Sequence, residues 1–94
     1  MPLFLSEQQV VELLGPADAV EAVEASFLRM AGGGIDIAPR RRLALDEGRL
    51  ADMAAADIEL GYAGAKVYAA YAEGVSFVVA LFAADRPELV ALIE

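Results

Sequence analysis

The sequence predicts an α+β fold in which two N-terminal helices pack on a largely antiparallel β-sheet, and we expect the chain to dimerise through that sheet. Between residues 7 and 31, apolar residues recur at the three- and four-residue spacings of a helix. From Ile35 onward the apolar period changes to two, which is the period of a β-strand. Helices that precede a run of strands joined by short turns are typical of the α+β class.

Two helix signals follow a short apolar strand at Leu3–Leu5. Ser6 fits a capping box with the glutamine three residues later, so we expect the first helix to begin there. Gly15-Pro16 ends this helix and starts the second, because proline suits the first turn of a helix. The second helix ends at Gly32–Gly34, and its apolar stripe consists of residues spaced by three and four: Val20, Val23, Phe27 and Met30.

Five further segments predict strands: Ile35–Leu45, Leu50–Ala55, Tyr62–Tyr71, Val75–Ala84 and Leu89–Ile93. In the first of these, strict alternation places Arg41 on the same face as Ile37. Arg40 and Arg42 then point to the other face, so Arg41 alone is in phase with the apolar residues. Pro39 cannot donate a hydrogen bond to a neighbouring strand, so this strand is either an edge strand or broken there.

The composition limits the classes of function. The 94 residues form one domain, and 59% of them are hydrophobic, which suggests apolar surface that a partner subunit or a second domain covers. The net charge of −8 disfavours nucleic-acid binding, and the cluster Arg40–Arg42 has no aromatic residues interleaved with it. The longest apolar run, Val75–Ala84, is shorter than the roughly 20 residues that span a bilayer. We therefore expect a cytoplasmic protein without nucleic-acid or membrane partners.

Several kinds of active site are excluded because the chain lacks both cysteine and histidine. Neither a Ser-His-Asp nor a Cys-His arrangement can be assembled, and a metal site built from these ligands is excluded as well. The glycine run Gly32–Gly34 follows a helix instead of joining a strand to a helix, so it does not fit a phosphate-binding loop. We expect no metal site and no cofactor-binding residues in this chain.

The only lysine of the chain, Lys66, lies inside the apolar segment Gly61–Tyr68. Burying its ammonium group without a partner costs several kcal/mol, and an anionic ligand would supply the partner. Arg41 could reach the same pocket from another strand, where its guanidinium would hold a carboxylate through two parallel hydrogen bonds. Two alternatives stay open: an ordinary strand lysine with its head in water, and an ion pair across the sheet for Arg41.

Six segments, taken in order, resemble the ornithine cyclodeaminase/mu-crystallin family: Leu3–Val10, Ala17–Glu24, Pro39–Leu43, Leu60–Tyr68, Val78–Phe82 and Leu89–Glu94. The resemblance implies a mixed α+β domain that binds substrate and dimerises, joined in full-length members to a Rossmann domain that binds NAD(H) or NADP(H). It implies reactions that pass through imines of amino acids. It also implies that Arg41 grips the substrate carboxylate and that Lys66 assists proton transfer near the reacting carbon.

We therefore expect residues 1–94 to form a single substrate-binding and dimerisation domain of an ornithine cyclodeaminase-like NAD(P)-dependent enzyme, with the Rossmann domain absent. Lys66 is the candidate catalytic residue, and Arg41 and Lys66 are the candidate substrate-binding residues. The expected ligand is a small amino, imino or keto acid, and the expected assembly is a homodimer. Such a domain would be truncated and inactive alone, because the cofactor site and the family's catalytic aspartate lie in the missing part. The alternative is a standalone, non-enzymatic module for homo-oligomerisation or small-acid binding.

Overall fold

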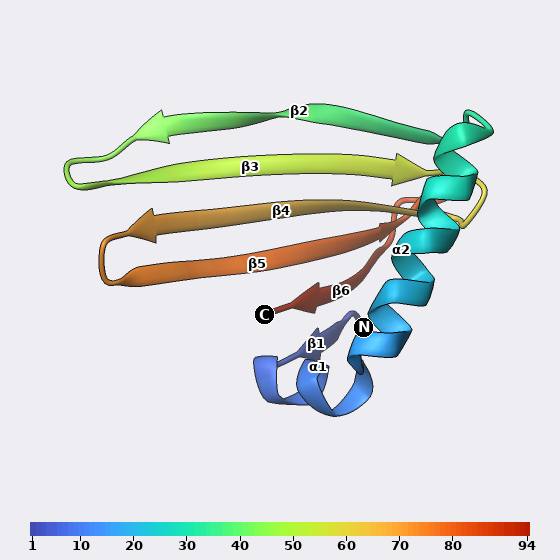
Figure 1. Ribbon diagram of the computed structural model, residues 1–94, viewed down its shortest axis with the longest axis horizontal. Coiled ribbons are helices and arrows are strands. Elements are labelled where there is room, and N and C mark those ends of the chain that lie inside the picture. The colour runs from blue at the N-terminus through green and yellow to red at the C-terminus, as the bar shows by residue number, and fades with distance from the viewer.

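The computed structural model describes residues 1–94 as two helices and one six-stranded sheet (Figure 1). The predicted α+β class is therefore confirmed. In chain order the elements are β1 (Leu3–Leu5), α1 (Glu7–Leu13), α2 (Pro16–Ala31), β2 (Ile35–Ala44), β3 (Gly48–Asp57), β4 (Tyr62–Tyr71), β5 (Gly74–Ala83) and β6 (Leu89–Ile93).

The sheet has the strand order β1-β6-β5-β4-β3-β2. The strands β2, β3, β4 and β5 form an antiparallel meander, and β6 continues it on the other side of β5. The exception is β1, which lies parallel to β6 with Leu3 opposite Ala91. The largely antiparallel arrangement is thus confirmed, and the predicted strand Tyr62–Tyr71 coincides with β4.

Local sequence signals fix the ends of both helices. The side chain of Ser6 accepts a hydrogen bond from the amide of Gln9 at 3.2 Å, and the amide of Ser6 donates to the Gln9 side chain at 2.9 Å. This reciprocal pair is the predicted capping box. The second helix begins after Gly15, whose amide donates a hydrogen bond to the Asp18 carboxylate at 3.1 Å. Neither helix is long and apolar enough to cross a membrane.

The helix α2 crosses one end of the sheet, where β2 begins and β3 ends (Figure 1). An ion pair between Arg29 Nε and Asp57 Oδ2 at 2.6 Å ties it there. Partial burial raises the pKa of Asp57, but hydrogen bonds from the Leu60 amide and from Arg29 outweigh it, so the pKa lies below its ordinary value. The stability that this carboxylate contributes is fully present above about pH 4, the ordinary aspartate pKa, and is lost as the pH falls through the lowered value.

The strand registers divide the side chains of β2–β5 between two faces. Lys66 on β4 lies opposite Met53 on β3 and Val79 on β5, and we call the face that they share the lysine face. Asp52 and its cross-strand partner Val67 point the other way, and we call their face the far face. The helix α2 packs against one end of the lysine face.

Very little of the chain is buried. Only Ala51, Ala83 and Ala91 are, with exposed fractions of 1%, 8% and 3%, and no large side chain is fully buried. Both faces of the sheet therefore present apolar surface of the kind that a further protein layer covers. The large exposed apolar side chains include Ile37, Tyr62, Val75 and Phe77 on the lysine face, Leu43, Val67, Tyr71, Val78 and Phe82 on the far face, and Val20, Val23 and Phe27 on α2.

The register of β2 shifts by one residue at Pro39. Ala38 and Arg41 pair with β3 residues that are only two positions apart, so Pro39 and Arg40 together oppose a single residue in a β-bulge. As predicted, β2 is an edge strand that is irregular at Pro39. The prediction that Ile37 and Arg41 share a face is wrong, because the extra residue reverses the alternation. Ile37 lies on the lysine face and Arg41 on the far face.

Gly48, the first residue of β3, is required by a close approach between strands. A Cβ at this position would lie 2.5 Å from the Ala70 carbonyl oxygen and 2.6 Å from the Tyr71 ring. We expect Gly48→Ala to lower the free energy of unfolding by about 1–3 kcal/mol, the usual cost of overpacking. Urea denaturation followed by circular dichroism measures the change.

Gly64→Ala is the matched control for this substitution. A Cβ at Gly64 would have its nearest neighbour, the Ala80 carbonyl oxygen, at 3.5 Å, which is an ordinary contact. We expect the control to change the free energy of unfolding by less than about 0.5 kcal/mol, or to raise it, since alanine suits a strand interior better than glycine. Equal losses in the two variants would contradict the steric explanation.

Candidate functional site

Lys66 lies in the middle of β4 on the lysine face and is only partly exposed. The ion pairs of the structure involve Arg29, Arg41 and Arg86, so the ammonium group of Lys66 has no carboxylate partner. Its Nζ lies 5.6 Å from the ring centroid of Tyr68, two residues along the same face. At this distance the ring accepts no hydrogen bond from Nζ, so the three N–H donors are free for an anion.

Lys66 lines an apolar hollow of about 380 Å³ on the lysine face. A second hollow of about 310 Å³ adjoins it beneath Met30 of α2. The two hollows share Ile37, Ala55 and Gly64, so they form one continuous depression, which we call the lysine groove. Its lining is mostly apolar, and Lys66 carries its only positive charge. The groove therefore suits a small acid with a short apolar part.

Gly64 keeps the lysine groove open where its two halves meet. A Cβ there would lie 3.5 Å from the Ala80 carbonyl oxygen and 4.0 Å from Leu81, so the backbone has room for a side chain. Because Gly64 has the same phase as Tyr62 and Lys66, that side chain would project into the groove between them. The glycine therefore serves the shape of the groove more than the packing of the sheet.

The structure does not bring Arg41 and Lys66 together. Arg41 lies on the far face and binds its cross-strand partner Asp52, with Nε to Oδ1 and Nη2 to Oδ2 both at 3.1 Å. The Arg41 side chain is 81% exposed and does not line the lysine groove. The ion pair across the sheet, one of the alternatives open from the sequence, is thus present. Carboxylate binding by Arg41 stays a prediction.

Arg40 and Arg42 lie on the lysine face instead. Arg42 pairs with Ala51, which shares that face with Lys66, and alternation places Arg40 on the same side. Neither arginine lines the lysine groove, so each would have to swing toward a ligand bound there. Strict alternation along the strand places Arg40 and Arg42 on the face opposite to Ile37, so it could not predict that they lie on the lysine face. Pro39, a proline in mid-strand, was the signal that could have done so, because such prolines often accompany bulges.

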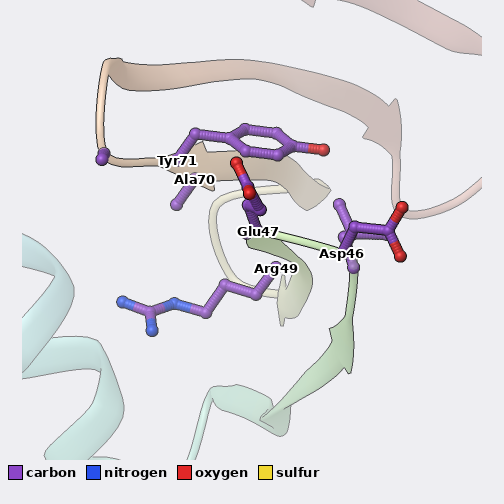
Figure 2. Close-up of a pocket in the computed structure, with 8 residues that line it drawn as sticks. Asp46, Glu47, Arg49, Ala70 and Tyr71 are labelled. Atoms are coloured by element: carbon purple, nitrogen blue, oxygen red, sulfur yellow. The ribbon is translucent and has the colours of Figure 1, made fainter.

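A larger hollow, of about 500 Å³, lies where the turn Asp46–Arg49 meets the end of β4 (Figure 2). In Figure 2 the Tyr71 ring lies across this turn, and the Asp46 carboxylate and the Arg49 guanidinium extend away from each other. Its charged groups therefore do not converge on one point as they do in a ligand site. The lysine groove remains the better candidate.

The chain shows neither a cluster of metal-ligating side chains nor a dinucleotide-binding turn. No group of three or more aspartate, glutamate, histidine or cysteine residues is placed to hold a metal ion. The run Gly32–Gly34 follows α2 and leads into β2, so no glycine-rich turn joins a strand to the N-terminus of a helix. The residues of this chain therefore do not fit a dinucleotide cofactor.

Solved structures of several enzymes share this fold over nearly the whole chain. A probable ornithine cyclodeaminase from Bordetella pertussis Tohama I is 26% identical, with a TM-score of 0.92 over 100% of this chain. An archaeal alanine dehydrogenase dimer with bound NAD is 25% identical, with a TM-score of 0.90 over 98%. The Δ1-pyrroline-2-carboxylate reductase of Thermococcus litoralis, in complex with NADH and L-proline, is 22% identical, with a TM-score of 0.91 over 98%.

The chain spans only part of these enzymes. It covers 30% of the length of the first two and 31% of the third, in their N-terminal part. No family model matches the sequence, and no curated protein matches it. The resemblance to ornithine cyclodeaminase-like enzymes is therefore confirmed for the fold of their N-terminal part.

Lys66 should be dispensable for folding if its ammonium group serves a ligand. We expect Lys66→Met to change the free energy of unfolding by less than about 0.5 kcal/mol, or to raise it, because it removes a charge that has no ion-pair partner and adds an apolar side chain to an apolar hollow. The control, Arg29→Met, breaks the 2.6 Å ion pair with Asp57 and should be clearly the more destabilised variant. Urea denaturation compares the two. A loss above about 1 kcal/mol in Lys66→Met would assign Lys66 a structural role.

Proposed function

We propose that this chain is the substrate-binding and dimerisation domain of an ornithine cyclodeaminase-like, NAD(P)-dependent enzyme that acts on amino or imino acids. One observation carries the proposal: Lys66, a partly exposed residue whose ammonium group has no carboxylate partner, lines an apolar groove. The fold around it is that of a probable ornithine cyclodeaminase and an alanine dehydrogenase, whose names specify small amino acids as substrates.

The groove would orient a small acid by its two ends. The apolar part of the ligand lies along the groove toward α2, and its polar end lies beside Lys66. With three N–H donors, Nζ of Lys66 can hydrogen-bond the carboxylate or the nitrogen of the ligand and can move a proton at the reacting carbon. The redox chemistry would come from a nicotinamide cofactor on a separate domain, so this chain alone is inactive in the proposal.

An arginine of the cluster Arg40–Arg42 is the proposed second cation. The sequence predicts Arg41 for this role, but its guanidinium would have to leave Asp52 and reach around the edge strand β2. Arg40 lies on the lysine face and takes part in no ion pair. The register therefore favours Arg40 over Arg41 as the partner of a carboxylate bound beside Lys66.

The proposed homodimer forms through the far face of the sheet. The lysine face already carries α2 and the ligand groove, which leaves the far face for a second copy. Each of the strands β2–β5 has 10 residues. Together they make that face about 33 Å long and about 19 Å wide, roughly 600 Å² before side-chain relief is counted. A standard interface buries about 800 Å² per partner, so the area is of the right order.

A standalone, non-enzymatic module for homo-oligomerisation or small-acid binding is the second candidate. The exposed apolar side chains of the far face favour self-association whether or not the chain belongs to an enzyme. A dimer therefore does not separate the two candidates, whereas ligand binding does. For both we propose a cytoplasmic location, which suits a chain without cysteine.

Titration of the isotope-labelled chain with L-alanine, L-proline and pyruvate tests the ligand site. We expect at least one of these acids to shift the amide NMR signals of Gly64, Lys66 and Val79, which surround the groove. Lys66→Met should weaken this binding about tenfold or more, because the acid loses its cationic partner. Absence of binding by every acid, together with a stable dimer, would favour the non-enzymatic module.

Arg40→Ala and Arg41→Ala form a matched pair for the same titration, because adjacent residues of one type lie on opposite faces. The register predicts about tenfold weaker binding in Arg40→Ala and little change in Arg41→Ala. The reverse pattern would identify Arg41 as the carboxylate ligand, as the sequence predicts.

Cofactor binding is tested separately by calorimetric titration with NADH. The chain has no glycine-rich strand-to-helix turn, so we expect no measurable binding at micromolar concentrations. Micromolar affinity of the 94 residues for NADH would contradict the assignment of the cofactor to another domain.

A further inference from the structure

The lysine groove runs from Lys66 along β4 toward α2, and Gly64 lies where its two hollows meet. Gly64 and Tyr62 follow Lys66 at about 7 and 13 Å along the strand. An acid as small as alanine that is held at Lys66 therefore ends before the hollow beneath Met30, whose volume is about 310 Å³. A ligand that fills this second hollow as well has a longer side chain.

The passage between the two hollows is open because Gly64 has no side chain. Its φ is not positive, so the backbone conformation does not require glycine. A Cβ there would have only the Ala80 carbonyl oxygen at 3.5 Å and Leu81 Cδ1 at 4.0 Å as near neighbours. Both atoms belong to β5, so no atom of the strand β3 or of α2 closes the passage above Gly64.

The hollow beneath Met30 suits the apolar end of a ligand better than a second carboxylate. Its only charged lining residue is Asp57, and Arg29, which pairs with Asp57, does not line it. The Ser26 hydroxyl, which does line it, already donates to the Val23 carbonyl oxygen at 2.7 Å. A ligand carboxylate placed there would meet a like charge within a mostly apolar lining, and this weakens binding.

We propose that Gly64 sets the length of the ligand, and that the groove takes an aliphatic monocarboxylic amino, imino or keto acid with a side chain longer than that of alanine. This inference rests on the proposed function. The carboxylate of the acid lies at Lys66, and its side chain passes Gly64 into the hollow beneath Met30. Each methylene group that enters this hollow leaves water, so the affinity rises with chain length until the hollow is filled.

NMR titration of the isotope-labelled chain with two matched series tests the inference: L-alanine, L-norvaline and L-glutamate, and pyruvate, α-ketovalerate and α-ketoglutarate. In each series the second acid has two methylene groups more than the first, and we expect it to bind about tenfold more tightly. It should also shift the amide signals of Ser26 and Leu60, which line only the hollow beneath Met30. The third acid, a diacid of the same chain length, should bind about tenfold more weakly than the second.

Gly64→Val blocks the passage and should abolish the preference for the longer acid, while the affinity for the shorter acid stays within about threefold. The control is Ala70→Val, on the same strand and face but outside the groove, and it should keep the preference. Circular dichroism checks that both variants fold. If Gly64→Val does not fold, Gly64→Ala replaces it, because its Cβ makes only ordinary contacts, and the preference should then fall at least about threefold.

The outcomes separate this inference from the proposed function. Binding that depends on Lys66 but is equally tight for short and long acids would overturn the role of Gly64 and leave the ligand site intact. So would a preference for the longer acid that persists in Gly64→Val. A preference for the diacid would overturn the assignment of an apolar ligand end to the second hollow. Absence of binding by all six acids would overturn the inference and the ligand site together.

Discussion

The physical constraint behind this structure is a sheet that is apolar on both faces while its own helices cover only one end of one of them. Three buried alanines make up the whole of its buried interior. An antiparallel sheet commonly has one face that is polar and exposed to water. Both faces of this sheet instead have the apolar composition of surfaces that a further protein layer covers. The chain spans 30% of the length of the probable ornithine cyclodeaminase and of the alanine dehydrogenase that share its fold.

A single extra residue in β2 decides which cations can act together. Without the bulge at Pro39, Arg41 would lie on the face of Lys66. With it, Arg41 faces Asp52 on the other side, and Arg40 and Arg42 come to the lysine face. One stretch of three arginines is thereby divided between the two faces of the sheet, with Arg40 and Arg42 on the lysine face and Arg41 on the far face.

Much of the fold could be predicted from the sequence because local signals and periodicity agree with the tertiary structure. The capping box at Ser6, the helix limits and the strand Tyr62–Tyr71 are examples. The bulge could not be placed, because a period of two carries no information on a one-residue shift between paired strands. The prediction of Lys66 as a cation inside a strand does not depend on the bulge, because Lys66 lies on another strand. The predicted face of Arg41 is wrong because Arg41 follows the bulge, and there it pairs with Asp52. The parallel pairing of β1 with β6 joins the two ends of the chain and leaves no local signal either.

Hydroxyl-radical footprinting across a series of protein concentrations tests most directly whether self-association covers the far face and leaves the lysine face exposed. Tyr71 and Phe82 report on the far face, and Tyr62 and Phe77 report on the lysine face; all four are exposed in the separate chain. The account predicts that the far-face pair loses reactivity as the concentration rises, while the lysine-face pair keeps it. Protection of Tyr62 and Phe77 in place of Tyr71 and Phe82 would contradict it.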